Sequence, residues 1–179
     1  KTHTATRPFC LFISYSGNTE ETVSVAKDAI DENLEWAAIS SGGELLELAN
    51  KYNKNFVKVP DGLQPRAAFG LMTKAVINFL PNQTKEIFIN ECQEAGNYLN
   101  NLTGDVSNEV FEISKNIASQ IGSKTAVIYA GSDLTYLVAQ RWKTQINENS
   151  KSKAYVGFMP EVHHNEILSW EADQEGSKN

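Results

Sequence analysis

The stretch Pro8-Phe9-Cys10-Leu11-Phe12-Ile13, followed by Ser14-Tyr15-Ser16-Gly17-Asn18-Thr19-Glu20-Glu21-Thr22, decides the fold. The first part is a short continuous apolar run, which predicts a buried strand. The second part leads into a helical pattern with Val23, Ala26 and Ile30 on one face. The polar cluster therefore lies at a turn from a strand to a helix, which is where open α/β sheets bind their ligands.

This polar turn has the composition of an anion site. The hydroxyls of Ser14, Ser16 and Thr19 surround Gly17, which allows the backbone to approach a ligand closely. The helix that follows directs N–H groups and the positive end of its dipole to the same place. The lysine of a nucleotide-triphosphate loop is missing. The alternative is a helix N-cap formed by Thr19. Capping alone does not require three hydroxyls, so we expect an anion site.

Composition limits the class of protein. The 179 residues are 41% hydrophobic and 21% charged, which is typical of a globular chain, and the net charge of -6 argues against general nucleic-acid binding. No run approaches the roughly 20 apolar residues of a membrane helix. The two cysteines, Cys10 and Cys92, form neither a disulfide framework nor a metal motif. We therefore expect a cytoplasmic protein that does not bind membranes.

The rest of the chain alternates between strand and helix patterns, which predicts βαβ units and parallel sheets. A domain boundary is expected within residues 81–108, followed by a second α/β unit and a frayed tail over 173–179. The expected strands are 36–40, 55–60, 123–130 and 154–158, the expected helices are 44–49, 67–79, 86–102, 109–120 and 134–146, and a polar loop is expected over 159–166, before 167–170.

Two further charged residues are candidates for a site. Arg66 lies at a helix start and Glu148 at a helix end. At each of these positions the helix dipole is unfavourable for the charge of the side chain. Arg66 could therefore face an anionic partner, or it could be a surface arginine paired with a carboxylate. Glu148 could serve as a general base, or it could belong to a solvated helix end.

The segment His163-His164-Asn165-Glu166 leaves two kinds of chemistry open. His-His-x-Glu could hold a metal, but a third ligand at suitable spacing is lacking. A single imidazole could act as a general acid or base near neutral pH, and His164 precedes the apolar segment 167–170. A glycine-rich dinucleotide loop is absent, so nothing supports a nicotinamide cofactor.

The opening motif at 14–22 resembles the signature of the sugar isomerase (SIS) domain, a flavodoxin-like fold that binds phosphosugars. Together with the segments 64–68, 147–151 and 160–166, it resembles the bifunctional phosphoglucose/phosphomannose isomerase family. The resemblance covers nearly the whole chain. It implies tandem SIS domains, a homodimer, a role in glycolysis and gluconeogenesis, and no metal or organic cofactor.

The resemblance also implies a role for each candidate residue. Ser14, Ser16 and Thr19 match positions that hold the substrate phosphate, and Arg66 matches an arginine that stabilises the enediolate-like intermediate. Glu148 matches the base that moves a proton between C1 and C2. His164 matches a histidine that assists ring opening from the partner subunit, and His163 has no assigned role.

The sequence departs from the family pattern at both ends. A Gly-Gly-Ser turn that would precede the first strand is missing, and Lys178 lies in a polar tail that does not resemble the family's lysine-bearing C-terminal helix. We therefore expect an α/β protein with tandem flavodoxin-like SIS domains, their parallel sheets flanked by helices, incomplete at both ends. The expected parts are a first domain over 1–85, a connection over 86–108 and a second domain over 109–179.

The function expected from these features is the interconversion of glucose 6-phosphate or mannose 6-phosphate with fructose 6-phosphate through a cis-enediol. One alternative is a phosphosugar sensor without catalysis, which would keep the hydroxyl cluster but would not need Glu148 or His164. Another is an aminosugar-phosphate isomerase or deaminase, which would share only the first motif.

Overall fold

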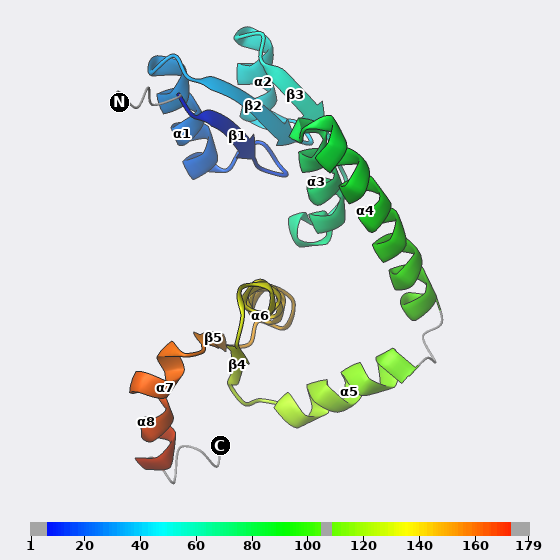
Figure 1. The fold of residues 1–179 in the computed structure, drawn as a ribbon, viewed down its shortest axis with the longest axis vertical. Helices are drawn as coiled ribbons and strands as arrows, with labels where there is room; N and C mark the ends of the chain where they lie inside the picture. Colours follow the sequence, from blue (N-terminus) through cyan, green and yellow to red (C-terminus); the bar gives the residue numbers. More distant parts are fainter. Residues whose placement is uncertain (1–6, 105–108, 173–179) are drawn as a thin grey trace. The chain divides into compact units, whose positions relative to one another are not determined.

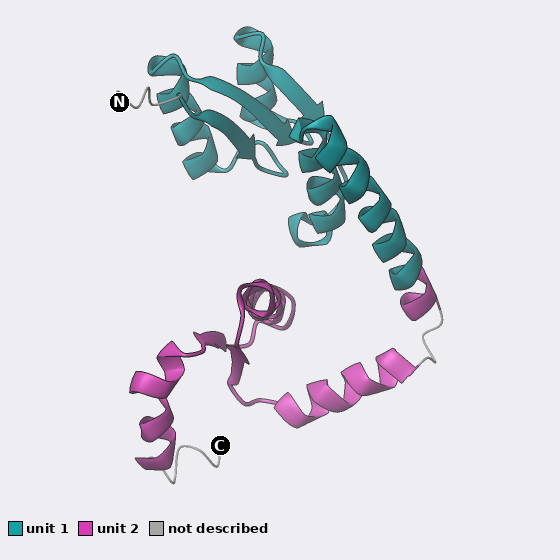
Figure 2. Cartoon of the chain, viewed as in Figure 1, with its two compact units in different colours: residues 1–99 teal, residues 100–179 magenta. Residues whose placement is uncertain are grey.

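A computed structural model describes residues 7–104 and 109–172 of the chain. The chain forms two compact units, Lys1–Leu99 and Asn100–Asn179 (Figure 2), and each is described by itself. The expectation of a frayed tail over 173–179 lies outside the described residues. Within the described part of the chain, no helix has the length and apolar character needed to cross a membrane.

Unit 1 contains a parallel three-stranded sheet in the order β1-β2-β3 (Figure 1). Leu11 of β1 lies opposite Ala37 of β2, which in turn lies opposite Asn55 of β3. The helical elements are α1, α2, η1, α3, η2 and α4, the last of which continues beyond Leu99. Their bounds are β1 Phe9–Ile13, α1 Glu20–Asp31, β2 Glu35–Ser40, α2 Gly43–Lys51, β3 Asn55–Lys58, η1 Pro65–Ala67, α3 Phe69–Val76, η2 Ile77–Phe79 and α4 Asn82–Thr103.

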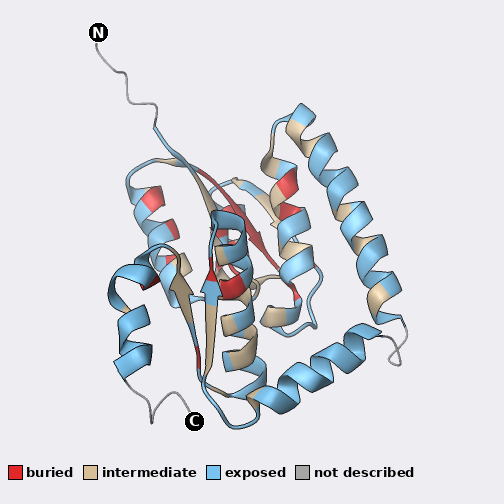
Figure 3. Ribbon diagram, turned by 60° about the horizontal axis from the view of Figure 1, so that its bottom comes forward, coloured by how far each residue is buried: buried red, intermediate tan, exposed pale blue. Residues whose placement is uncertain are grey.

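Both faces of this sheet are covered. Alternate residues of the strands point to opposite faces. Phe12, Trp36 and Leu45 belong to one buried cluster, on the α1 and α2 side. Ile39 and Ala75 belong to a second cluster, on the α3 side. Strand β2 is buried over nearly all its length (Figure 3), as expected of the central strand of a parallel sheet. Burial of each large apolar side chain contributes about 1.5–3 kcal/mol.

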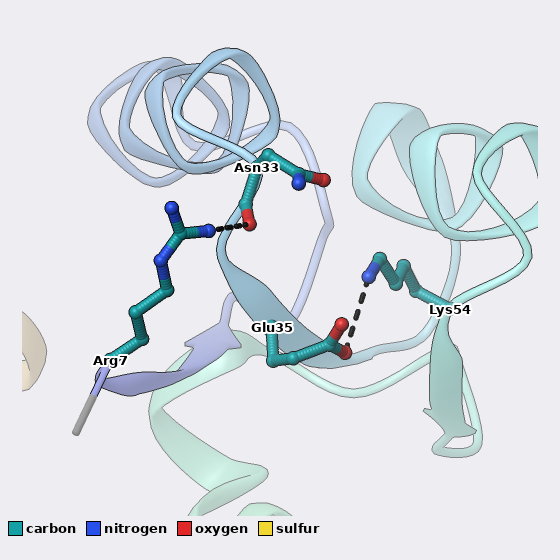
Figure 4. A network of polar contacts seen from close by, with 4 residues as sticks. All are labelled: Arg7, Asn33, Glu35 and Lys54. Atoms are coloured by element: carbon teal, nitrogen blue, oxygen red, sulfur yellow. Dashed lines mark hydrogen bonds and ion pairs between the residues drawn. The ribbon is translucent and has the colours of Figure 1, made fainter.

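The amino ends of the strands carry charged contacts (Figure 4). Arg7 Nη1 donates to the carbonyl of Asn33 at 3.2 Å, and Lys54 Nζ donates to Glu35 Oε2 at 3.3 Å. The Glu35 side chain is 80% exposed, so solvent screens this ion pair and its contribution to stability is small. The opposite, carboxyl edge of the sheet is where the hydroxyl cluster lies.

Unit 2 contains a two-stranded parallel sheet in which β4 pairs with β5. A helix precedes the pair, one connects the strands and two short helices follow. The bounds are α5 Glu109–Ile121, β4 Ala126–Ala130, α6 Asp133–Gln145, the π-helical turn η3 Ile146–Ser150, β5 Ala154–Phe158, α7 Glu161–Asn165 and α8 Ile167–Ala172. The observed strands and helices confirm the predicted α/β alternation.

Three local predictions are corrected. The helix expected over 67–79 is divided into η1, α3 and η2. The helix expected from residue 86 begins at Asn82, because the carbonyl of Pro81 already accepts from Lys85 N at 2.8 Å. The polar loop expected over 159–166 is wrong, because Glu161–Asn165 is helix α7. Val162 is the apolar residue that anchors this helix, with 5% of its surface exposed.

Candidate functional site

The hydroxyl cluster is built into the loop between β1 and α1. Ser14 is buried, whereas Ser16 and Thr19 are exposed. Ser14 Oγ lies 2.7 Å from Thr19 Oγ1 and accepts from Gly17 N at 3.1 Å. Ser16 Oγ accepts from Asn18 N at 3.2 Å. The structure therefore brings the three predicted phosphate ligands together in one loop.

The number of hydroxyl protons shows what this loop can bind. A hydroxyl supplies one proton and two acceptor lone pairs. Ser14 and Thr19 together have two hydroxyl protons. One of these protons forms the hydrogen bond between the two side chains, and the other can be donated to a ligand oxygen. Ser16 acts as an acceptor toward Asn18 N, so its own proton can also be donated to a ligand. These donors at the start of α1 suit an anion.

The N-cap alternative for Thr19 is only half right. Thr19 does occupy the N-cap position of α1, but its side chain makes no capping hydrogen bond. Its hydroxyl lies against Ser14 instead. The first helical hydrogen bond, from Val23 N to the Thr19 carbonyl at 3.0 Å, leaves the amides of the first turn pointing out of the helix end. The position of the loop and the helix dipole therefore favour an anion, and the anion site stays a prediction.

A second loop, between β2 and α2, interlocks with the first. Gly17 has φ +74°, and a Cβ placed on it would lie 1.8 Å from the Gly42 carbonyl oxygen. Gly43 has φ +70°, and its Cβ would lie 2.5 Å from the Ser16 carbonyl oxygen. Leu45 N donates to the Gly17 carbonyl at 3.0 Å. Both positions therefore require glycine for conformation and for space.

Asn18 has a structural role that the sequence did not indicate. Its Oδ1 accepts from Glu44 N at 2.9 Å, across a separation of 26 residues. Glu44 is in the first turn of α2, whose own N-cap residue, Gly42, has no side chain to cap it. Asn18 therefore caps α2 from the neighbouring loop. The Ser40-Ser41-Gly42-Gly43 run after a strand was the available signal that a second loop lines this edge.

The third loop at this edge leads to Arg66. Tyr15 Oη donates to the carbonyl of Pro60 at 3.0 Å and accepts from Leu63 N at 2.9 Å. Arg66 follows in the turn η1, where Pro65 occupies the first position as predicted. Arg66 is half-buried and has polar or electrostatic contacts of its own. The contacts of Tyr15 therefore connect the loop that leads to Arg66 with the loop of the hydroxyl cluster.

Glu148 and His164 lie in unit 2 and are described there alone. Glu148 is exposed in the turn η3, and its Oε2 lies 3.8 Å from Lys151 Nζ. His164 is exposed within α7, in the segment that was expected to be a loop, and it precedes the helix α8, as predicted. Glu148 precedes β5 and His164 follows it. The two side chains therefore belong to opposite ends of this strand.

A polar cluster supports α7, the helix that carries His164. Tyr129 Oη donates to Glu166 Oε1 at 2.6 Å. Partial burial is the main cause that raises the pKa of the Tyr129 phenol above its ordinary value of 10.0, and the Glu166 carboxylate raises it further. Trp170 Nε1 donates to the same oxygen at 3.4 Å.

Within the described residues, no group of three His, Cys, Asp or Glu side chains is arranged to hold a metal.

Comparison with known proteins identifies the family that this chain resembles. Residues 112–179 match the family described as the bacterial phospho-glucose isomerase C-terminal SIS domain. Bifunctional phosphoglucose/phosphomannose isomerases of Aquifex aeolicus and Thermoplasma acidophilum are 41% and 42% identical over 90% and 87% of this chain. The chain belongs to the bifunctional phosphoglucose/phosphomannose isomerase family. The predicted family is thereby confirmed.

The relatives also set limits on this assignment. The chain spans about half of their length, 47% and 46% for these two. A D-glucosamine-6-phosphate 4-epimerase of Sulfolobus acidocaldarius is 32% identical over 90% of the chain and 51% of its own length. The C-terminal domain of glucosamine-fructose-6-phosphate aminotransferase from Francisella tularensis has a TM-score of 0.61 and 17% identity, covering 90% of this chain and 47% of that one. This last likeness concerns the fold alone and confirms the α/β class.

Proposed function

We propose that this chain carries the residues of an aldose–ketose isomerase that interconverts glucose 6-phosphate or mannose 6-phosphate with fructose 6-phosphate. The observation that carries the proposal is the hydroxyl cluster at the carboxyl edge of the unit 1 sheet, in a chain of this family. A phosphate is the anion for which hydroxyl donors and a helix N-terminus are suited.

The proposed reaction assigns one step to each candidate residue. Ser14, Ser16 and Thr19 hold the phosphate, and His164 assists opening of the sugar ring. The Glu148 carboxylate removes the proton from C2 of the open-chain aldose and returns it to C1 through a cis-enediol. The Arg66 guanidinium stabilises the negative charge that develops on the substrate oxygen, as preorganised charges do in catalysis. We propose that this reaction requires no metal or organic cofactor.

We further propose a homodimer in which His164 acts on the substrate bound by the other subunit. The geometry of unit 2 supports this arrangement. Glu148 and His164 lie beyond opposite ends of β5, whose residues Ala154–Phe158 span about 13 Å. Residues of two copies related by symmetry can instead meet at one substrate, with Glu148 supplied by one copy and His164 by the other.

The direct test is an assay that couples the formation of glucose 6-phosphate from fructose 6-phosphate to a dehydrogenase. It is run on this chain and on a longer natural chain that contains it. Glu148→Gln should abolish turnover and leave phosphosugar binding nearly unchanged. Glu112→Gln is the matched control, because Glu112 is also an exposed carboxylate paired with a lysine three residues later. Wild-type turnover in Glu148→Gln would contradict the assigned base.

The dimer is tested by mixing two inactive variants, Glu148→Gln and His164→Ala. Random exchange of subunits makes half of the dimers mixed, and each mixed dimer has one intact site of two. About a quarter of the wild-type activity should therefore return after mixing. If the mixture stays inactive although mass spectrometry shows exchanged subunits, the two residues act from the same subunit.

A second candidate function follows from one of the relatives. The 32% identity to a protein named D-glucosamine-6-phosphate 4-epimerase makes an aminosugar phosphate an alternative substrate. Incubation with glucosamine 6-phosphate and analysis of the product by NMR separates the two. Inversion at C4 would support the epimerase, and interconversion at C1 and C2 of a hexose 6-phosphate supports the isomerase.

A further inference from the structure

Tyr15 is placed between the two serines of the hydroxyl cluster but does not itself belong to the proposed phosphate ligands. Its ring is half-buried and packs against the cluster that contains Ile39, Val59 and Ala75. The hydroxyl lies at the far end of this ring. There it forms two hydrogen bonds with a loop more than 40 residues later in the chain. It donates to the Pro60 carbonyl at 3.0 Å and accepts from Leu63 N at 2.9 Å.

The backbone of Tyr15 is held as firmly as its side chain. Its carbonyl oxygen accepts from Ser41 N at 2.8 Å and from Ser41 Oγ at 2.7 Å. One residue therefore connects all three loops at the carboxyl edge of the sheet, those that follow β1, β2 and β3. The separations along the chain are 26 residues to Ser41 and 48 residues to Leu63.

The loop held by the phenol leads directly to Arg66. Only Gln64 and Pro65 stand between Leu63 and Arg66, and the Gln64 carbonyl accepts from Ala67 N at 2.8 Å. Pro65 fixes its own φ and restricts the residue before it, so little freedom remains between the phenol contact and Arg66. Gly62 has φ +86°, a conformation that favours glycine, and the contact at Leu63 follows it directly.

We propose that Tyr15 is a positioning residue that fixes Arg66 relative to the phosphate-binding hydroxyls. This inference rests on the proposed isomerase function. The phosphate is bound by the residues on either side of Tyr15, and the charge stabilised by Arg66 develops at the other end of the substrate. The Tyr15 hydroxyl therefore sets the distance between the two ends. A displacement of about 1 Å at a catalytic group can cost about 100-fold in rate.

The test is Tyr15→Phe, which keeps the packed ring and removes the hydroxyl. We expect kcat to fall at least roughly tenfold, while KM and the Kd of inorganic phosphate change less than about twofold, because the phosphate ligands stay in place. Tyr52→Phe is the control, since it removes a phenol hydroxyl at the exposed end of α2 and should leave both constants unchanged. Equal losses in phosphate affinity and rate would overturn the proposal.

A double-mutant cycle shows whether Tyr15 acts through Arg66. In an Arg66→Ala background, Tyr15→Phe should cause no further loss of kcat, because the group that it positions is gone. Independent, additive losses would show that Tyr15 does not act through Arg66 and would overturn the proposal. The cycle compares rates only, so a loss of stability common to both backgrounds cancels.

A measurement without turnover separates this inference from the proposed function. Hydrogen exchange of the Leu63 amide should accelerate at least tenfold in Tyr15→Phe, and the Nε resonance of Arg66 should shift or broaden. If the wild-type protein does not isomerise sugars, the proposed function fails, and these two signals still decide whether Tyr15 holds the Arg66 loop. An unchanged Leu63 exchange rate together with an unchanged Arg66 resonance would overturn the inference.

Discussion

Replacement of Gly17 by alanine is the sharpest test of the interlocked loops. An alanine at φ +74° costs about 1–2 kcal/mol in backbone energy. Its Cβ would also lie 1.8 Å from the Gly42 carbonyl oxygen, which is backbone and cannot rotate away. The loops must therefore separate, and the hydrogen bond from Leu45 N to the Gly17 carbonyl would be lost at a net cost of about 1 kcal/mol. These two terms together predict a loss of at least about 2–3 kcal/mol in the free energy of unfolding of unit 1.

Two other glycines provide matched controls. Gly62 has φ +86° but open space around it, so Gly62→Ala should cost only the backbone term of about 1–2 kcal/mol. Gly96 lies inside helix α4 with open space, so Gly96→Ala should be neutral or stabilising by up to about 1 kcal/mol. The difference between Gly17→Ala and Gly62→Ala isolates the clash.

The assay is urea unfolding followed by the fluorescence of Trp36, which is buried in unit 1 with 2% of its surface exposed. Trp142 and Trp170 are replaced by phenylalanine in all variants so that only unit 1 is observed. If Gly17→Ala is no less stable than Gly62→Ala, the two loops do not interlock as described.

Two further predictions concern single contacts. Asn18→Ala should destabilise unit 1 by about 1 kcal/mol in urea unfolding, because α2 loses its cap, whereas Asn18→Asp, which keeps the acceptor oxygen, should lose much less; equal losses would refute the capping role. In a titration of tyrosine absorbance, Glu166→Gln should lower the pKa of Tyr129 toward its ordinary value of 10.0, although burial should keep it somewhat raised. Because the pKa of Tyr129 is raised in the folded state, the stability that its protonated phenol contributes is fully present below about pH 10 and is lost as the pH rises through the folded-state pKa. Tyr129→Phe should therefore lower the free energy of unfolding at neutral pH and lower it progressively less in alkali. A difference in the free energy of unfolding between the variant and the wild type that stays constant with pH would contradict this.

Local patterns in the sequence were sufficient to predict most of the fold. The apolar run before Ser14 and the alternation of strands and helices identified every strand of both sheets to within a few residues. The serines and Thr19 were also found locally, because they lie within six positions of one another. Periodicity and composition are properties of neighbouring residues, so elements built from neighbours are recognisable.

The contacts that join the loops could not be predicted in this way. Asn18 caps a helix 26 residues away, and Tyr15 holds a loop 48 residues away. The sequence immediately around Asn18 and Tyr15 does not indicate that Glu44 and Leu63 are their hydrogen-bond partners. Helix α7 was missed for a related reason, because its single buried residue, Val162, is surrounded by polar side chains that are typical of a loop.

The central proposal is that Glu148 moves a proton on a phosphosugar whose phosphate is bound by Ser14, Ser16 and Thr19. The most direct measurement is the NMR spectrum of fructose 6-phosphate incubated with the protein in D₂O, which reports exchange of the C1 proton. The account predicts deuterium at C1 with the wild-type protein and with Glu112→Gln, and none with Glu148→Gln, although all three bind the phosphosugar. Exchange at the wild-type rate in Glu148→Gln would contradict the account.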